Sequence, residues 1–462
     1  MSCVRWDSES PREFASRDGR TYTVAPGILF VPEIRLHGKP AEGTDWLSLR
    51  TQSFPGPSAV SPVVVFLAGG PGESAIQWPR HGPFLRAFET LQKVAEVVLI
   101  DQRGCGASVG KLSVARGAPL PADALRTEAD LIDAYRNDAR QRSNALRSAG
   151  VPITAYTPED SADDIADLVR CAPNRAVVLL GYSYGSHLAM AAIRRHPGVF
   201  ERAILCGFEG PDQTLKLPSQ IDLQIARIAA IVAAQGGPPD LKSLMRRVHR
   251  RLAAAPVAVP SDANSLPTAL GEAGLRHIVA GWCSLSNRMG RIARLYTDLE
   301  RGGTQEAAEA VALFAKTWPK PPAFFLNDSA SGISQERLAT IHREAASDHF
   351  VDGPILGNAA NWPFPGIRTD WGQRDLGDEF RKPFATDLPM LIFTGGLDGF
   401  TPTTNLPEAL AGLPNTSHYE IACAAHNDLL VCSAAVEAMA RFVAGDKMAA
   451  GQRFAVPVPT LA

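Results

Sequence analysis

The chain has 462 residues, and its 46 Lys and Arg against 48 Asp and Glu leave a formal net charge of −2. This length predicts more than one domain, or one domain that carries a large insertion. The nearly balanced charge excludes a broad electrostatic field for nucleic acid or an anionic membrane, so we expect a small-molecule or short-peptide substrate. The sequence indicates no particular oligomeric state.

The N-terminal segment MSCVRWDSESPREFASRDGR mixes both charge signs and lacks the apolar core of a secretory signal. The longest apolar runs, such as VVVFLAGG, fall well short of the roughly 20 residues that cross a bilayer. Seven cysteines, from Cys3 to Cys432 without a CxxC pair, indicate reduced thiols rather than a disulfide framework or a zinc site. A pair between Cys423 and Cys432 would be the exception. We therefore expect a soluble, cytoplasmic protein.

The first two extended segments are TYTVAPGILFVPEIRL (21–36) and WLSLRTQSF (46–54), whose alternating apolar and polar residues predict an antiparallel edge hairpin. Four later runs are short and continuously apolar, which is typical of strands buried on both faces of a parallel sheet. They begin at Pro62, Ala95, Ala176 and Arg202. The helical patterns EDSADDIADLVRCA and YGSHLAMAAIRRHP lie before and after the third run. This repeated alternation predicts a doubly wound α/β sheet.

After Phe208 the pattern becomes mostly helical and rich in Ala, Arg and Leu, with proline-rich joints, until about Phe384. Strand patterns then resume with LPMLIFTGG and HYEIACAA, and a last helix, NDLLVCSAAVEAMARFVAG, follows. We predict one α/β domain, made of residues 1–208 and 386–462, that is interrupted by a helical cap insertion over 209–385.

The strongest chemical signal is GYSYGS (181–186), which matches GxSxG between a buried strand and a helix. In a nucleophile elbow the serine occupies a strained turn, so the residues two before and two after it must be small. Gly181 and Gly185 meet this demand. We predict Ser183 as a nucleophile and the N–H of Tyr184, at the helix N-terminus, as an oxyanion donor. An ordinary strand-to-helix turn is the alternative, because GxSxG also arises by chance.

A second oxyanion donor is expected from the loop LAGGPGES after the strand that begins near Pro62. Glycines allow backbone amides to approach a reacting carbonyl closely, whereas Pro71 has no N–H. We prefer Gly70 as the donor, with Gly69 as the alternative. Alone, this loop would be interpreted as a tight turn.

A serine hydroxyl needs a base to take its proton, and an imidazole base needs a carboxylate to orient it. The resumed strands place Asp398 in GLDGFTP and His426 in AAHN, in the chain order Ser, acid, His that this arrangement requires. Alone, Asp398 would be interpreted as a turn residue and His426 as a helix cap. His418 competes as the base but lies at the start of its strand, and His187 is expected to be structural.

With AGGPG, DQRGCGAS, GYSYGS, GGLDGFTP and AAHN in this order, the chain resembles the prolyl aminopeptidase and tripeptidyl aminopeptidase family of α/β-hydrolases. The match covers roughly residues 60–210 and 385–445. The resemblance implies an α/β-hydrolase fold, peptidase activity, an oxyanion loop at GGPG and a DxRGxGxS motif after the next strand. That motif is matched by Asp101, Gln102, Arg103, Gly104, Gly106 and Ser108.

The chain departs from the family at Ala68, where a His often precedes GGPG, and at Ala425, where a Gly often precedes the catalytic His. Neither departure removes a catalytic group. The resemblance also implies acidic cap residues that hold a free amino terminus, but no matching cap motif is present.

A cationic amine buried under a cap needs a nearby carboxylate. Glu209 and Asp212, in GFEGPDQT at a strand exit, are our candidates for binding it, and a solvated loop or helix cap is the alternative. Cys105, between two loop glycines, is expected to be a small filler rather than a second nucleophile.

Together these residues predict two-step acyl transfer without a metal or organic cofactor. Because a fold does not determine a substrate, three functions stay open at this point. The preferred one is an aminopeptidase-type peptidase acting on short peptides or aminoacyl amides. The others are a carboxylesterase or lactonase acting on a small ester, and a non-catalytic protein that binds a ligand under its cap.

Overall fold

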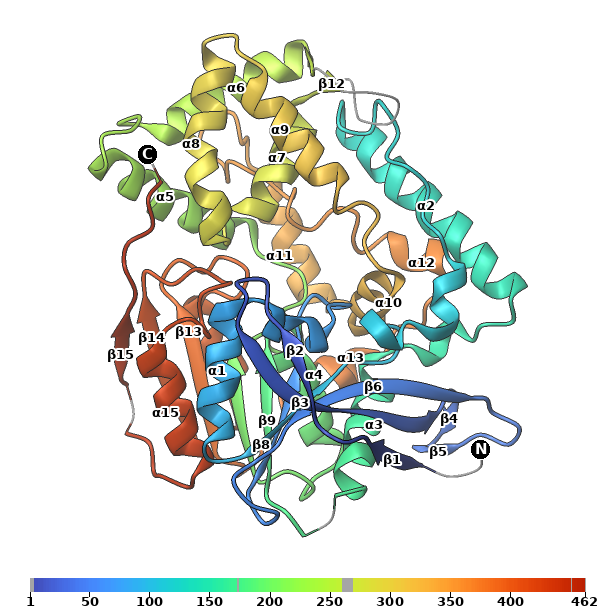
Figure 1. The fold of residues 1–462 in the computed structure, drawn as a ribbon. Coiled ribbons are helices and arrows are strands. Elements are labelled where there is room, and N and C mark those ends of the chain that lie inside the picture. The colour runs from blue at the N-terminus through green and yellow to red at the C-terminus, as the bar shows by residue number, and fades with distance from the viewer. Residues whose placement is uncertain (1–3, 173, 260–268, 450, 462) are drawn as a thin grey trace.

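The computed structural model describes residues 4–172, 174–259, 269–449 and 451–461 (Figure 1). Its centre is an 11-stranded sheet in the order β1-β3-β6-β8-β7-β9-β10-β13-β14-β15, and β2 also pairs with β3. The strands are β1 (Arg5–Ser8), β2 (Arg12–Ala15), β3 (Thr21–Pro32), β6 (Trp46–Phe54), β7 (Val63–Leu67), β8 (Glu96–Ile100), β9 (Val177–Tyr182), β10 (Arg202–Cys206), β13 (Met390–Gly395), β14 (Thr416–Ala422) and β15 (Arg453–Ala455). Two small ribbons pair β4 (Arg35–Leu36) with β5 (Lys39–Pro40) and β11 (Val257–Ala258) with β12 (Ala269–Leu270).

From β8 to β15 all neighbouring strands of the sheet run parallel. Every residue of β7, β9 and β13 is buried, because helices cover both faces of this part of the sheet. The parallel sheet predicted from the continuously apolar runs is therefore confirmed. Parallel strands also bring their carboxyl ends to one edge, where the segments after β7, β9, β10, β13 and β14 meet.

The predicted hairpin is confirmed, since β3 and β6 pair antiparallel from Ala25 with Ser53 to Pro32 with Trp46. Its expected position at the edge of the sheet is wrong. Strands β1 and β2 both pair with β3, and β6 joins β8 on its other side. Each of these two outer strands has only four residues and carries charges, so neither shows a clear alternating pattern. They satisfy backbone groups that β3 would otherwise leave unpaired.

Helices pack against both faces of the sheet. On one face, α1 (Gly82–Gln92) and α15 (Ser433–Val443) contribute Phe88 and Met439 to the core, and on the other, α3 (Pro158–Arg170) and α4 (Tyr184–Arg195) contribute Ile165 and Leu188. The last helix begins later than the pattern from residue 427 predicted. Residues 427–432 form turns instead, because the Asp428 carboxylate accepts hydrogen bonds from Ala425 N and the Ser286 hydroxyl.

A body of helices lies over the sheet (Figure 1), and most of it comes from the chain between β10 and β13. These helices are α5 (Pro218–Ala234), α6 (Leu241–Ala254), α7 (Glu272–Trp282), α8 (Ser286–Glu300), α9 (Gln305–Ala315), α10 (Pro322–Ser331), α11 (Gln335–Ala345), α12 (Ile367–Trp371) and α13 (Asp378–Arg381), while α14 (Leu406–Ala409) follows β13.

The earlier helix α2 (Glu128–Ser148) also belongs to this body. Its Tyr135 hydroxyl lies 3.0 Å from His277 of α7, and its Ser143 hydroxyl donates to the Trp371 carbonyl of α12. The boundaries of the insertion at 209 and 385 stay predictions. No helix among the described residues is sufficiently long and apolar to span a membrane.

Candidate active site

Ser183 lies on the tight turn between β9 and α4. Its backbone angles of φ 55° and ψ −127° are in a region that non-glycine residues rarely occupy, so the turn is strained. A Cβ on Gly185 would come 1.9 Å from the Leu67 carbonyl oxygen, and one on Gly181 would come 2.5 Å from the Gly185 carbonyl oxygen. Both positions therefore require glycine for this turn to form.

Asp398 and His426 follow β13 and β14, at the same edge of the sheet as Ser183. The Nδ1 atom of His426 lies 2.7 Å from Oδ2 of the fully buried Asp398. With Nδ1 donating to the carboxylate, Nε2 is left to accept a proton. Asp398 also accepts hydrogen bonds from Phe400 N at 2.8 Å, Thr401 N at 3.0 Å and the Thr401 hydroxyl at 2.6 Å.

The electrostatics of Asp398 favour its ionised form. Burial by itself would raise the pKa of Asp398, but His426 and the donors from Thr401 outweigh this and lower the pKa below its usual value. The acid is therefore a charged anchor for the imidazole at neutral pH.

Ser183 and His426 both lie next to the end of β10. The backbone N–H of Ser183 donates to the Cys206 carbonyl at 2.8 Å, and a Cβ on the next residue, Gly207, would lie 3.1 Å from Cε1 of His426. Within the described chain, no hydrogen bond joins the Ser183 hydroxyl to His426. Such bonds are often long in a free enzyme and shorten when substrate binds.

The loop after β7 contacts the nucleophile turn directly. A Cβ on Gly69 would lie 2.9 Å from the Ser183 Cβ, so only a glycine permits this approach. Gly70 has a φ of 111°, and no backbone acceptor for its N–H exists among the residues that the structure describes. Tyr184 is the first residue of α4, so its N–H has no acceptor within the helix. These two N–H groups are the predicted oxyanion donors.

The motif after β8 holds the loop after β7 in place. The buried Asp101 carboxylate accepts from the Ser74 hydroxyl at 2.8 and 2.9 Å, and the Gln102 amide donates to the Ala68 carbonyl at 3.2 Å. Burial raises the pKa of Asp101 in spite of these hydrogen bonds. The motif thus holds both ends of the loop that carries the predicted donor Gly70.

Residues 62–431 match the family described as the α/β-hydrolase fold. The chain belongs to this family. The strand order, the nucleophile turn and the order of Ser183, Asp398 and His426 agree with this assignment. No curated protein sequence matches this α/β-hydrolase-fold protein.

Solved structures similar to this α/β-hydrolase-fold protein include a proline iminopeptidase-related protein from Thermus thermophilus, at 16% identity and a TM-score of 0.36, covering 90% of this chain and 98% of that one. An esterase from Thermogutta terrifontis has 16% identity and a TM-score of 0.37, with 87% and 94% covered. A proline iminopeptidase from Mycobacterium smegmatis has 16% identity and a TM-score of 0.39, with 86% and 94% covered. Similarity of this degree carries no argument about the substrate.

The predicted amine-binding acids of this α/β-hydrolase-fold protein already have partners. The Lys216 ammonium donates to Glu209 at 2.8 Å, and both carboxylate oxygens of Asp212 accept from Ser334, at the start of α11. A substrate ammonium at Glu209 would have to displace Lys216. Cys105 is buried, and burial raises the pKa of its thiol, which agrees with its expected role as a filler.

His418, the competitor for the base, and His187, which was expected to be structural, both make contacts away from Asp398. Nε2 of His418, near the start of β14, lies 2.8 Å from the Thr394 hydroxyl. His187 is buried in α4, with Nε2 2.9 Å from the Ser331 hydroxyl, and burial lowers its pKa. Both histidines therefore have structural contacts, and neither contacts Asp398.

Sequence reasoning missed Ser284, in the short connection between α7 and α8. Its carbonyl accepts from His426 N at 2.8 Å, and its buried hydroxyl accepts from Gly399 N at 2.9 Å. One residue of the helical body thus contacts the loops of both Asp398 and His426. No signal marked it, because CSLSN resembles any short polar connection between helices.

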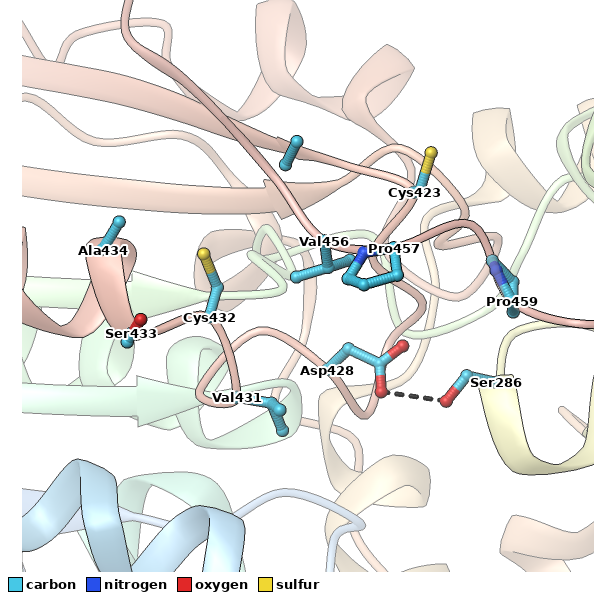
Figure 2. Close-up of a pocket in the computed structure, with 11 residues that line it drawn as sticks. Ser286, Cys423, Asp428, Val431, Cys432, Ser433, Ala434, Val456, Pro457 and Pro459 are labelled. Atoms are coloured by element: carbon cyan, nitrogen blue, oxygen red, sulfur yellow. Dashed lines mark hydrogen bonds between the residues drawn. The ribbon is translucent and has the colours of Figure 1, made fainter.

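A pocket of about 460 Å³ lies beside the loop that carries His426. Figure 2 shows the Ser286 hydroxyl and the Asp428 carboxylate joined by a hydrogen bond of 2.9 Å at this pocket. Cys423 and Cys432 also line it, and their thiols are apart and form no disulfide. The disulfide between Cys423 and Cys432, which the sequence left open as an exception, is therefore not formed.

Proposed function

We propose that this protein is a serine hydrolase in which Ser183 is the nucleophile, His426 the base and Asp398 the acid that orients it. The observation that carries the proposal is the 2.7 Å contact between Asp398 and His426 at the strand edge that holds Ser183 on its strained turn. The Ser183 oxygen attacks the substrate carbonyl carbon while His426 takes the hydroxyl proton. The resulting oxyanion accepts hydrogen bonds from the N–H groups of Tyr184 and Gly70.

In the second part of the reaction, His426 passes the proton to the leaving group as its bond to the carbonyl carbon breaks. A water molecule, deprotonated by His426, then attacks the acyl group on Ser183, and the serine hydroxyl is restored as the acid product leaves. All proton transfers in this scheme use one imidazole.

For the substrate we propose a short peptide or aminoacyl amide that is cleaved from its amino end. The motifs that resemble prolyl and tripeptidyl aminopeptidases support this choice, as does the helical body over the site, which limits the length of a bound chain. The two carboxylates predicted from the sequence to hold the amino terminus, Glu209 and Asp212, are already engaged by Lys216 and Ser334.

A fluorophosphonate probe tests the catalytic part. We expect it to label the wild type but not Ser183→Ala, and we expect Asp398→Asn to lower kcat by about 10⁴ because the imidazole loses its tautomer partner. Ser148→Ala, at an exposed serine that ends α2, is the matched control and is expected to label normally. Unlabelled, correctly folded wild type would contradict the proposal and favour a ligand-binding protein.

Matched Ala- and Pro-anilides and esters test the substrate class. Anilide turnover that depends on a free α-amine is the expected result for a peptidase. Efficient ester turnover with inert anilides would instead assign a carboxylesterase or lactonase.

A further inference from the structure

A charged side chain projects from the loop that carries the predicted oxyanion donor. Glu73 ends this loop, and its Cγ lies 3.2 Å from the place where a Cβ on Gly70 would stand. Solvent reaches the side chain, yet protein surrounds it: burial raises the pKa of Glu73, partly offset by the charges of Lys320 and His426 and a hydrogen bond from Trp78. The Glu73 side chain therefore lies beside the loop of the predicted oxyanion donor, and the charge of His426 acts on it.

A second charged side chain faces this loop from the helical body. A Cβ on Gly72 would lie 3.3 Å from Phe324 N, so the start of α10 touches the loop. Just before α10, the Lys320 ammonium lies 5.8 Å from the centre of the Phe324 ring. It is also accessible to solvent but closely surrounded, and burial lowers its pKa while the charge of Glu73 acts in the opposite direction. Within the described chain, the ammonium has no hydrogen-bond or direct ion-pair partner.

Glu73 and Lys320 thus influence each other without forming an ion pair. Both side chains are accessible to solvent beside the loop of the predicted oxyanion donor, and within the described chain neither has a direct ion-pair partner. Glu73 has a further effect on catalysis, because a carboxylate beside Gly70 repels the negative oxygen that forms there. A cation that enters with the substrate would remove this repulsion.

An aminoacyl substrate carries such a cation one carbon from the carbonyl that Ser183 attacks. The carboxylate of a dipeptide lies on the leaving group, on the other side of the scissile bond. Fully extended, a dipeptide spans about 7 Å, which is longer than a direct ion pair, so its two termini can reach two unlike charges that do not touch each other.

We propose that Glu73 binds the α-ammonium and Lys320 the α-carboxylate of the same molecule, so that the substrates are dipeptides with both termini free. This inference rests on the proposed peptidase function and narrows it. Glu73 and Lys320 are then specificity-determining residues, and the chemistry at Ser183 is unchanged.

The wild-type enzyme provides the first test. Alanyl-alanine, its N-acetyl form, its C-terminal amide and the doubly blocked form are compared for kcat/KM and for protection of Ser183 against the fluorophosphonate probe. Because a hydrogen bond to a charged group is lost with each block, we expect each to lower kcat/KM by about 10- to 100-fold. Each block is also expected to weaken the protection of Ser183 against the probe.

Variants identify which residue recognises which terminus. Glu73→Gln is expected to reduce the preference for a free amino terminus by about tenfold or more while retaining the preference for a free carboxylate, and Lys320→Gln is expected to do the reverse. Glu42→Gln and Lys316→Gln, at other exposed positions, are the charge-matched controls. Both controls are expected to keep the wild-type preferences.

Separate results distinguish this inference from the proposed function. Absence of Ser183 labelling contradicts the serine hydrolase itself. Normal labelling, with blocked and free peptides cleaved or protecting equally well, overturns the dipeptide inference and leaves the nucleophile in place. The dipeptide inference is also overturned if both variants fold but keep the wild-type preferences. If a variant fails to fold, the series of blocked peptides with the wild-type enzyme decides.

Discussion

Asp398 keeps its charge although its exposed fraction is 0%. A buried carboxylate normally loses its charge unless hydrogen bonds or an opposite charge replace water. Phe400, Thr401 and His426 provide four such contacts, and they also hold the carboxylate in one orientation. The same interactions that keep the acid ionised therefore aim the imidazole.

At the residue scale, we predict opposite effects for one substitution at two glycines. Gly185→Ala should lower the free energy of unfolding by about 3 kcal/mol, because its Cβ would come 1.9 Å from the rigid carbonyl of Leu67. Gly281→Ala, in α7 with no atom within 4 Å of the added Cβ, should raise it by up to about 1 kcal/mol. Urea unfolding measures both, and equal effects would contradict the steric argument.

At the scale of elements, buried ion pairs connect α3 to the loop after β8 and to the hairpin region. The Arg103 guanidinium donates two hydrogen bonds of 2.7 Å to Asp164 of α3, and Arg35 donates to the same carboxylate at 2.8 Å. These contacts join the loop after β8, the hairpin region and α3. Next to them, Asp163 of α3 accepts from Arg195 and His196 at the end of α4, each at 2.7 Å. The helix that follows the nucleophile is thereby tied to its neighbour.

We predict that the contribution of Asp163 depends on pH. Burial would raise its pKa, but hydrogen bonds from His196 and Arg195 and the nearby positive charges lower the pKa from 3.8 to about 2. Because folding lowers this pKa, the stabilisation of about 2 kcal/mol is complete above about pH 4 and is lost as the pH falls towards 2.

Urea unfolding of wild type and Asp163→Asn at several pH values measures this. The difference in unfolding free energy should be large at pH 7 and should shrink with acidification below pH 4. Asp133→Asn, at an exposed residue of α2, is the control and should change stability by less than about 0.5 kcal/mol. A difference that stays constant with pH would contradict the linkage.

At the scale of the whole molecule, the helical body supports the loops of Asp398 and His426 as well as covering the sheet. Gln224 of α5 donates to the carbonyls of Leu397 and Cys283, at 2.7 and 2.8 Å. Ser284 connects the loops of Asp398 and His426, as described above. The relative position of acid and base therefore depends on chain that lies between β10 and β13.

We predict that Ser284→Ala lowers kcat about tenfold with a smaller change in KM, because Gly399 N loses its acceptor and the Asp398 loop shifts relative to His426. Steady-state kinetics well below the unfolding temperature separates this effect from lost stability. Ser433→Ala, at an exposed serine that lines the pocket beside the His426 loop, is the matched control. An unchanged kcat for folded Ser284→Ala would show that this contact does not position the site.

Much of the fold was predictable because its signals are local. The apolar runs of β7, β9 and β13 follow from burial on both faces, and the glycines around Ser183 follow from the space that a tight turn allows. The short strands β1 and β2 were not predictable, since a strand of four residues with two charges makes no clear alternating pattern. The late start of α15 was not predictable because it depends on the contacts of Asp428.

By itself, the sequence determined the parallel sheet, the strained turn at Ser183 and the order in which Ser183, Asp398 and His426 follow their strands. These properties depend on hydrophobic patterns and steric limits among residues close in the chain. Only the tertiary structure decided that Ser284 joins the loops of Asp398 and His426, that Asp212 is engaged by Ser334, and that the start of α10 contacts the loop after β7. Such contacts join residues more than a hundred positions apart in the chain, and packing in three dimensions selects them.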